Sequence, residues 1–434
     1  MTTIDDILMC YDRDGFLEDL GELRAKILNA AYWPEGDERH ASLTNIINSV
    51  KSEGDTAVAR FTKDYDSVDL SPDEFLVTAD KIAKAHSEVD DELMGSLRKS
   101  IENVRKYQTE IFTGKSIPGK VKYTPIKRVG VCIPGASAPL PSTVIMTAVP
   151  AQVAGVKEIA LISPPRYNNS IHPVILALCY ELGITEVYRV GGAQAVAALA
   201  YGTDHIQKVN KIVGPGSTWL QLAKRHVFGV TVDIDSIAGP SEVLVIADKT
   251  ANPAWVAADM LSQAEHAPGS AMVFTDSKEI GEQVIEELKK QVKQLDRAED
   301  TEKCLVEFSG VAVFESMDTV VDWANAFAAE HLQIQCGDDS NAIADRIENA
   351  GAIFIGPYTP VAVGDYWAGP SHTLPTGMSA KFFSALSSND FVKSTSIIQY
   401  DQQKLTSDST DIIRLARTEG LDAHARSVEI RCEK

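Results

Sequence analysis

Residues 128–135 read RVGVCIPG, an apolar run that ends at a proline and a glycine. Such a run predicts a buried strand that closes in a tight turn. A helical pattern follows over residues 142–154. The same order of strand, turn and helix returns three more times, over residues 158–182, 186–200 and 211–226. This repetition predicts a parallel sheet with helices on both faces.

Glycines stand at three of these turns, between the end of a strand and the start of a helix. They are Gly135, the pair Gly191-Gly192, and Gly214 with Gly216. Ligands of open α/β sheets bind at this edge, where helix N-termini favour anions. A dinucleotide is therefore one interpretation, although no Gly-x-Gly-x-x-Gly fingerprint occurs at any of the turns. The other interpretation is that these glycines only allow tight turns that need positive φ. For each turn taken alone, both interpretations stay open.

The regions on either side carry different patterns. Residues 1–115 have helical periodicity, and residues 1–25 are expected to form a separate arm. A strand pattern at residues 243–248 begins an alternation of strands and helices up to about residue 355, which predicts a second α/β unit. From residue 389 the pattern is helical again.

The composition limits the expected partners and location. The chain has 434 residues, 44% hydrophobic and 24% charged, as in ordinary globular proteins of roughly two to four domains. Its formal net charge of −20 repels phosphates, which argues against nucleic acid and anionic membranes as partners. The six cysteines form no Cys-x-x-Cys pair, and the acidic N-terminus lacks a signal-peptide pattern. No run approaches the ~20 apolar residues of a membrane span. We therefore expect a cytoplasmic protein with reduced thiols.

Four short stretches contain residue types that bind metals. Gln263 and His266 are three apart near the end of a helical pattern, so both side chains are expected on one helix face. An imidazole is a strong zinc ligand and an amide oxygen a weak one, so this pair needs further ligands. The later candidates are Glu330 with His331, Asp365 with His372, and Glu419 with His424. Each alone is more often an ordinary structural pair, and only their joint occurrence favours a metal site.

Eight long motifs, which follow one another in a fixed order, go beyond these single residues. They are residues 128–135, 141–146, 190–198, 238–248, 262–266, 329–332, 372–377 and 419–424. Together they resemble the signature stretches of the histidinol dehydrogenase family, from about residue 40 to the end. The resemblance implies a zinc-containing, NAD-dependent enzyme that oxidises L-histidinol to L-histidine through an aldehyde, in the last steps of histidine biosynthesis.

The resemblance also implies a role for each site residue. The implied zinc ligands are Gln263, His266, Asp365 and His424. His331 is the implied base for the hydroxyl proton, because an imidazole titrates near neutral pH, and Glu330 would activate water for the second oxidation. Implied substrate contacts are Ser241, Gln263, His266, His331, Asp365, His372, Glu419 and His424. The tail residues Glu419 and His424 would serve the neighbouring subunit, which implies an intertwined homodimer.

Three positions are implied to contact NAD. They are Cys132, Gln194 and Ser217. The family usually carries Tyr where this chain has Cys132 and Asn where it has Ser217, so a stacking ring and a two-ended amide are missing. Residues 377–386 also depart from the family pattern and are a candidate lining of the substrate pocket.

Pattern and resemblance together predict two Rossmann-like α/β domains without the usual glycine fingerprint, with helical N- and C-terminal extensions. The expected boundaries are 1–25 for the arm, 26–131 with 243–385 for the domain with the metal and catalytic residues, 132–242 for the NAD side, and 386–434 for a tail that reaches the partner subunit.

Three other interpretations stay open. The first is a relative that oxidises another small alcohol such as a sulfonated diol. Glu419 opposes it, because a carboxylate repels a sulfonate, whereas Lys381 is a candidate anion partner. The second is a zinc hydrolase without a nucleotide, but the chain lacks His-Glu-x-x-His. The third, a non-catalytic protein stapled by zinc, leaves Glu330 and His331 unexplained.

Overall fold

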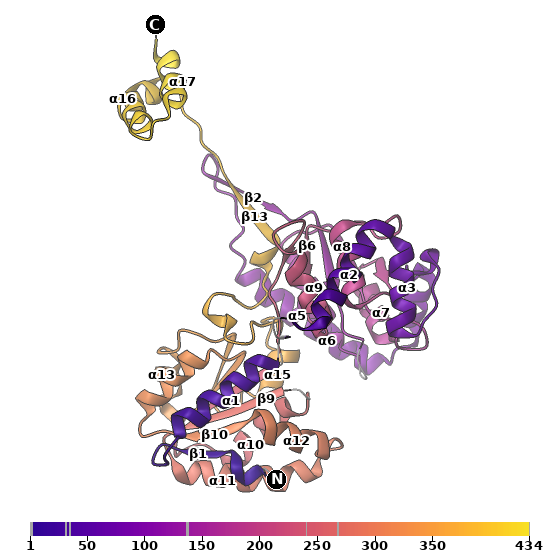
Figure 1. The fold of residues 1–434 in the computed structure, drawn as a ribbon, viewed down its shortest axis with the longest axis vertical. Coiled ribbons are helices and arrows are strands. Elements are labelled where there is room, and N and C mark those ends of the chain that lie inside the picture. The colour runs from indigo at the N-terminus through magenta and orange to yellow at the C-terminus, as the bar shows by residue number, and fades with distance from the viewer. Residues whose placement is uncertain are drawn as a thin grey trace. The chain divides into compact units, whose positions relative to one another are not determined.

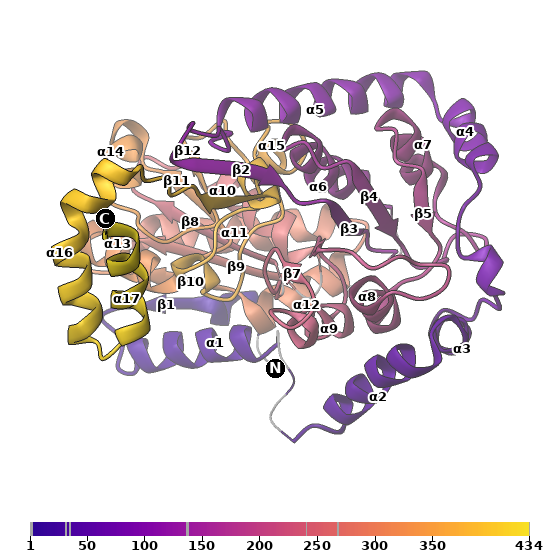
Figure 2. The same ribbon diagram turned by 90° about the horizontal axis from the view of Figure 1, so that it is seen from above.

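The computed structural model describes residues 3–30, 33, 36–135, 139–239, 241–266 and 269–433. The chain divides into two compact units, Met1–Phe112 with Ile126–Phe391 and Thr113–Pro125 with Val392–Lys434. Figures 1 and 2 show the ribbon from two directions. Within the described ranges, no helix is long and apolar enough to cross a membrane.

One sheet of the larger unit has six strands, and every neighbouring pair is parallel. In spatial order the strands are β1 (Leu8–Cys10), β10 (Gly310–Val313), β9 (Gly269–Thr275), β8 (Ser241–Ala247), β11 (His331–Gln335) and β12 (Ala352–Ile355). Successive residues of β8 face opposite sides of the sheet, so Val243 and Leu244 enter different apolar clusters. Both faces are thus covered, which explains the continuous apolar run of this strand.

Helices from distant parts of the chain cover the two faces. The cluster around Val243 contains α10 (Pro253–Ala264), α11 (Lys278–Gln291) and α12 (Ala298–Phe308). The cluster around Leu244 contains α1 (Phe16–Ala30), α13 (Met317–Phe327) and α14 (Ser340–Ala344). Figure 2 shows α1 running beside β1 at one edge of this sheet. The predicted second α/β unit is therefore present.

The other sheet of this unit has five parallel strands. In spatial order they are β5 (Glu186–Tyr188), β4 (Glu158–Ile162), β3 (Arg128–Cys132), β6 (Lys211–Val213) and β7 (Asp233–Ile234). Along the chain, β3, β4, β5 and β6 are each followed by a helix. In that order the helices are α6 (Pro141–Val153), α7 (Pro173–Glu181), α8 (Gly192–Tyr201) and α9 (Thr218–Val227). All four predicted strand–turn–helix repeats are confirmed, and the sheet is parallel as expected.

The N-terminal segments join these sheets differently from the expected boundaries. Ile4–Ile7 is a 3-10 turn that leads into β1, so this stretch ends in an edge strand and is not a purely helical arm. The helices α2 (Glu38–Glu53) and α3 (Asp55–Asp66) pack into the same apolar cluster as α8, on the five-stranded sheet. Helical periodicity cannot say which sheet a helix covers, because that depends on contacts far away in sequence.

Two further helices and the site helix complete the larger unit. They are α4 (Ala79–Glu88), α5 (Asp91–Glu110) and α15 (Val361–Tyr366). The smaller unit pairs β2 (Val121–Pro125) antiparallel with β13 (Val392–Ser396) and ends in α16 (Gln402–Thr418) and α17 (Asp422–Cys432). The helical pattern expected from residue 389 is wrong over β13, whose partner strand lies about 270 positions earlier and is invisible to local periodicity.

Candidate active site

Glu330 and His331 stand at the start of β11, between β8 and β12. Both side chains are buried, with 6% and 4% of their surface exposed. The chain reaches them from α13 through Ala328, which has a left-handed conformation with φ of 50°. The Glu330 carboxylate accepts a hydrogen bond from the backbone N–H of Glu242 at 2.9 Å. The pair is therefore held by the first residues of the neighbouring strand β8.

The ring of His331 is oriented by the same residue. Its Nδ1 atom lies 3.0 Å from the backbone carbonyl oxygen of Glu242. A carbonyl only accepts, so Nδ1 carries the proton and donates it there. In the neutral ring the lone pair is then on Nε2, which is buried, 3.6 Å from Asp365 Oδ1, and has no hydrogen-bond partner among the described residues. This nitrogen is the one available to take a proton.

Two carboxylates set the charge of this imidazole. Burial alone lowers the pKa of His331, but the negative charges of Glu330 and Asp365 outweigh burial and raise that pKa to about 10. Conversely, burial raises the pKa of Asp365, but the imidazole of His331 beside it and the nearby His372 and His266 lower that pKa overall. One carboxylate and three imidazoles thus interact electrostatically at this site.

Asp365 is placed by close packing around α15. A Cβ atom on Gly364 would come within 2.6 Å of the Phe354 ring, so glycine lets this helix lie flat on β12. The following loop is bound to the helices of the five-stranded sheet: Ser100 of α5 donates to the carbonyl of Tyr366 at 2.6 Å, and Ser371 donates to that of Met146 in α6 at 2.9 Å. The segment between Asp365 and His372 is therefore held in place by hydrogen bonds to α5 and α6.

His372 follows this loop directly. Burial lowers its pKa, while the charge of Asp365 opposes that effect. Its Nε2 atom is buried and finds no hydrogen-bond partner within the part of the chain that the structure describes. A second imidazole nitrogen with an unused lone pair or proton therefore lies near Asp365, as a ligand-binding role requires.

Gln263 and His266 do not share one helix, contrary to the expectation. The helix α10 ends at Ala264, and His266 lies two residues beyond it, exposed, while Gln263 is buried. The turn folds back on the start of β9, where a Cβ atom on Gly269 would overlap the carbonyl oxygen of Gln263. Three-residue spacing predicts a common face only while the helix continues, and it stops between the two residues.

The donor set fits a divalent metal only in part within this unit. Among the described residues, no group of three or more His, Cys, Asp or Glu side chains is placed to hold a metal ion. Of the implied ligands, only His266 and Asp365 are of those types and in this unit, and they interact electrostatically. Gln263 is an amide, and His424 belongs to the smaller unit. Imidazole and carboxylate donors suit zinc, but the set is incomplete without a residue from elsewhere.

The remaining implied substrate residues lie in both units. Ser241 begins β8, half-buried, in register with Gly269. Glu419 follows α16 and His424 is in α17, and both are exposed in the smaller unit. The structure therefore brings Glu330, His331, Asp365, His372 and His266 together in the larger unit. The tail residues Glu419 and His424 belong to the smaller unit.

The implied NAD contacts differ in exposure. Cys132 ends β3 with its thiol fully buried in the apolar cluster, and burial raises the pKa of this thiol to about 12. Gln194 is buried at the start of α8, and Ser217 is exposed at the N-terminus of α9. Gly214, with φ of 108°, passes so close to the Cys132 backbone that no side chain fits. The turn at Gly214 therefore needs glycine both for its positive φ and for its close packing against Cys132.

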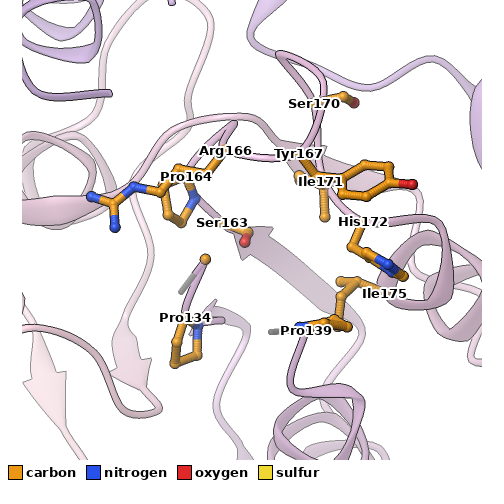
Figure 3. Close-up of a pocket in the computed structure, with 11 residues that line it drawn as sticks. Pro134, Pro139, Ser163, Pro164, Arg166, Tyr167, Ser170, Ile171, His172 and Ile175 are labelled. Carbon is orange, nitrogen blue, oxygen red and sulfur yellow. The ribbon is translucent and has the colours of Figure 1, made fainter. Parts of the chain in front are cut away.

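A cavity of about 310 Å³ opens at the carboxyl ends of β3 and β4 (Figure 3). Its walls include Pro134, Pro164, Arg166, Tyr167 and His172, and the Tyr167 and His172 rings meet edge to face at 4.5 Å. None of the three implied NAD residues lines it. No sequence motif indicates this cavity, although the Pro164-Pro165 break after β4 marks its position.

Comparison with known proteins decides the family. The family model described as histidinol dehydrogenase matches residues 35–432. The chain belongs to the histidinol dehydrogenase family. The resemblance drawn from the eight motifs is confirmed.

Named relatives agree over most of the chain. A histidinol dehydrogenase of Rhodopirellula baltica is 46% identical over 395 residues, which cover 89% of this chain and 85% of the relative. That of Bacillus subtilis is 44% identical over 405 residues, 91% and 93% of the two chains. The crystal structure of histidinol dehydrogenase from Elizabethkingia anophelis superposes with a TM-score of 0.88 at 33% identity and covers 98% of both chains.

Two residues that hold the site in place are not predicted by the motifs of this histidinol dehydrogenase family member. Glu242 lies within the 238–248 motif without being a candidate residue there, yet its backbone binds both Glu330 and His331. The signal was present, because Glu242 follows the candidate Ser241 directly. Ser100 has no such signal, because a serine within a helix gives no local indication that it binds Tyr366, 266 positions away.

Proposed function

We propose that this chain is a histidinol dehydrogenase that oxidises L-histidinol to L-histidine through histidinal, with two NAD, in the last steps of histidine biosynthesis. The observation that carries the proposal is the buried pair Glu330 and His331, aimed by Glu242 toward Asp365, in a chain that matches the family over residues 35–432. We expect it to work in the cytoplasm.

NAD supplies the hydride acceptor in both oxidations. In the first, Nε2 of His331 takes the proton of the substrate hydroxyl while the carbinol carbon loses hydride. The Nδ1–H bond to the Glu242 carbonyl keeps the ring in place as it becomes charged. The products of this step are the aldehyde, NADH and a proton on His331.

The second oxidation starts from the aldehyde. Glu330 takes a proton from water as the water oxygen bonds to the aldehyde carbon, and His331 gives the proton it took in the first step to the former carbonyl oxygen, which yields the hydrate. His331, neutral again, then takes a hydroxyl proton from the hydrate as the carbon loses the second hydride. The resulting carboxylic acid and the protonated Glu330 release their protons to solvent, which leaves the carboxylate. Glu330 is suited to this role, because the Glu242 N–H engages only its Oε2 atom in the hydrogen bonds described.

Zinc, when bound, would hold and orient the substrate's nitrogen atoms. The proposed ligands are Gln263, His266 and Asp365, with His424 of the partner subunit. The negative charge of Asp365 is one of two that raise the pKa of His331, and a divalent cation offsets it. Metal binding therefore moves His331 toward the neutral form that a base needs.

Substrate and cofactor contacts follow the same reasoning. Ser241 and His372 are proposed to contact the substrate from this subunit, and Glu419 from the partner in an intertwined homodimer. Gln194 and Ser217 are proposed NAD contacts, because both stand where a strand of the five-stranded sheet leads into a helix. The buried thiol of Cys132 leaves only its backbone for such a contact.

An NADH assay tests the proposal. Purified protein with zinc, NAD and L-histidinol should yield two NADH per histidinol and L-histidine as the final product. Turnover of a sulfonated diol without turnover of histidinol would favour the alternative substrate, which the named relatives do not support. Hydrolysis that ignores NAD, or zinc binding without any turnover, would overturn the proposal.

A further inference from the structure

Glu242 is a buried acid for which the proposed reaction has no direct use. Its side chain is 1% exposed, and its Oε2 atom has no hydrogen-bond partner within the described ranges. Its own backbone N–H and carbonyl bind Glu330 and His331. A shift of this residue would therefore move both catalytic side chains together.

The guanidinium of Arg24 balances this buried charge. Its Nη1 atom lies 3.2 Å from Glu242 Oε1, and its side chain is only 13% exposed. A buried ion pair is costly to break, because the remaining charge is left without a partner. Arg24 comes from α1, which lies before the residues that the family model matches.

The same guanidinium also holds the second segment that leads to the catalytic pair. Its Nη2 atom donates to the backbone carbonyl of Phe327, and its Cζ atom lies 3.7 Å from the centre of the Phe327 ring. Phe327 ends α13, three residues before Glu330. Arg24 is thus bound both to the strand that orients Glu330 and His331 and to the helix that precedes them.

Burial raises the pKa of Glu242 to about 7, the charge of Arg24 lowers it, and repulsion from the nearby Glu330 carboxylate adds to the rise. Without Arg24, the lowest-energy responses are protonation of one carboxyl or displacement of Glu242. Either one changes Glu330 or His331.

We propose that Arg24 is a positioning residue of the reaction, which clamps Glu242 and the Phe327 carbonyl and so fixes the two backbone segments that aim Glu330 and His331. The inference rests on the proposed function only in taking Glu330 and His331 as the catalytic pair.

The test compares Arg24→Met with Lys26→Met. Lys26 is on the same helix and pairs with Glu307 at 3.5 Å, but both side chains are about half exposed. Loss of Arg24 should lower kcat by ~10–100-fold, as removal of residues that orient catalytic groups does, with KM for histidinol and zinc content near normal. Lys26→Met should behave as wild type. A folded Arg24→Met enzyme with normal kcat would overturn the proposal.

Two further variants distinguish a clamp from general structural support. In Arg24→Ala, added guanidinium ion should restore part of kcat, whereas sodium at equal ionic strength should not. Glu242→Gln removes the buried charge, so adding Arg24→Met to it should cost less than Arg24→Met alone. Additive losses without rescue by guanidinium would assign Arg24 a merely structural role. If Arg24→Met does not fold, Arg24→Lys carries the comparison, because it keeps the charge but not the two-ended fork.

One readout is independent of turnover. Carbethoxylation of His331 by diethyl pyrocarbonate, followed by peptide mass spectrometry, should be faster in Arg24→Met than in wild type or Lys26→Met. If wild type makes no NADH from histidinol, the proposed function fails while this measurement still tests the clamp. An unchanged modification rate in the folded variant would overturn the clamp itself.

Discussion

The two nitrogens of His331 face different surroundings, and this difference defines its role. Nδ1 donates to a backbone carbonyl, and Nε2 faces Asp365 without a hydrogen bond among the described residues. The residue types at this site were predicted from sequence, because they lie in long motifs. The orientation was not, because it depends on Glu242, 89 positions away.

Replacement of His331 by Asn should abolish turnover and leave zinc in place. The amide is a poor base, so kcat should fall by at least ~10²–10⁴-fold. The metal content should be unchanged, because His331 is not a proposed ligand. Steady-state kinetics and elemental analysis of the purified variant check both parts. A near-normal rate would remove His331 as the base.

Replacement of His266 by Asn should instead release the metal. His266 is exposed on a turn, so its loss removes a proposed ligand without opening the core. Zinc per subunit should fall sharply, whereas the melting temperature of the metal-free protein should stay close to that of wild type. His226→Asn, at an exposed position in α9, is the control and should keep its zinc. Full zinc occupancy in the His266 variant would contradict the assigned ligand.

At the scale of elements, the helices and parallel strands follow from the sequence, but their ends carry the site. The helical pattern runs through His266, yet α10 stops at Ala264, where the turn packs against Gly269. Similarly, β13 lies in a stretch that reads as helical. Local periodicity describes the middle of an element, whereas packing partners determine where it stops.

The packing of Gly269 makes one such end testable. A methyl group there overlaps the Gln263 carbonyl, so Gly269→Ala should lower the free energy of unfolding by ~1–3 kcal/mol and reduce zinc affinity. Gly95→Ala is the matched control, because Gly95 lies within α5 with open space around it, and should stabilise by ~0.5–1 kcal/mol. Urea titrations measure both changes. Equal changes in the free energy of unfolding for Gly269→Ala and Gly95→Ala would show that the turn at Gly269 tolerates a side chain.

Asp259 of α10 gives a prediction about pH. Burial raises its pKa to about 6, although hydrogen bonds from Gln333 and Gln335 oppose the shift. Because the folded-state pKa exceeds the unfolded value of about 3.8, its favourable contribution is present below pH 4 and is lost as pH rises through about 6. Asp259→Asn should therefore gain stability relative to wild type between pH 4 and pH 7, by ~1–3 kcal/mol.

The amide of this variant also suits its surroundings. The Oε1 atoms of Gln333 and Gln335 are buried and lack a hydrogen-bond partner in the described part of the chain, so an Asn N–H₂ group can donate to one of them. Asp322→Asn, on the exposed face of α13, removes the same charge and should show no such pH-dependent gain. A constant difference between wild type and Asp259→Asn across this pH range would contradict the prediction.

At the scale of the whole chain, the sequence pattern predicts both parallel sheets but not how the segments are shared between them. Consecutive repeats over residues 128–226 predict four strands of the five-stranded sheet, whereas β7 lies after them. The six-stranded sheet takes β1 from the N-terminus and β12 from beyond residue 350, and such pairings leave no local pattern. The expected domain boundaries, including the one at residue 131, stay predictions.

Mixed subunits test the shared active site. If His424 serves the partner's site, a dimer of one His331→Asn chain and one His424→Asn chain has one intact site. Free exchange of two inactive parents should then restore about a quarter of the wild-type rate. Co-expression with two different affinity tags isolates the mixed dimer for measurement. A confirmed mixed dimer without activity would mean that each subunit completes its own site.

The parallel pairing of β1 with β10 also governs how the chain is made. Leu8 is aligned with Val311, about 300 positions later. At ~5–20 residues per second, the ribosome needs ~15–60 s after the first strand emerges before its neighbour exists. During that interval the apolar side chains of Ile4, Ile7 and Met9 have no sheet to cover. The edge of this sheet therefore closes only late in synthesis, after β10 has been made.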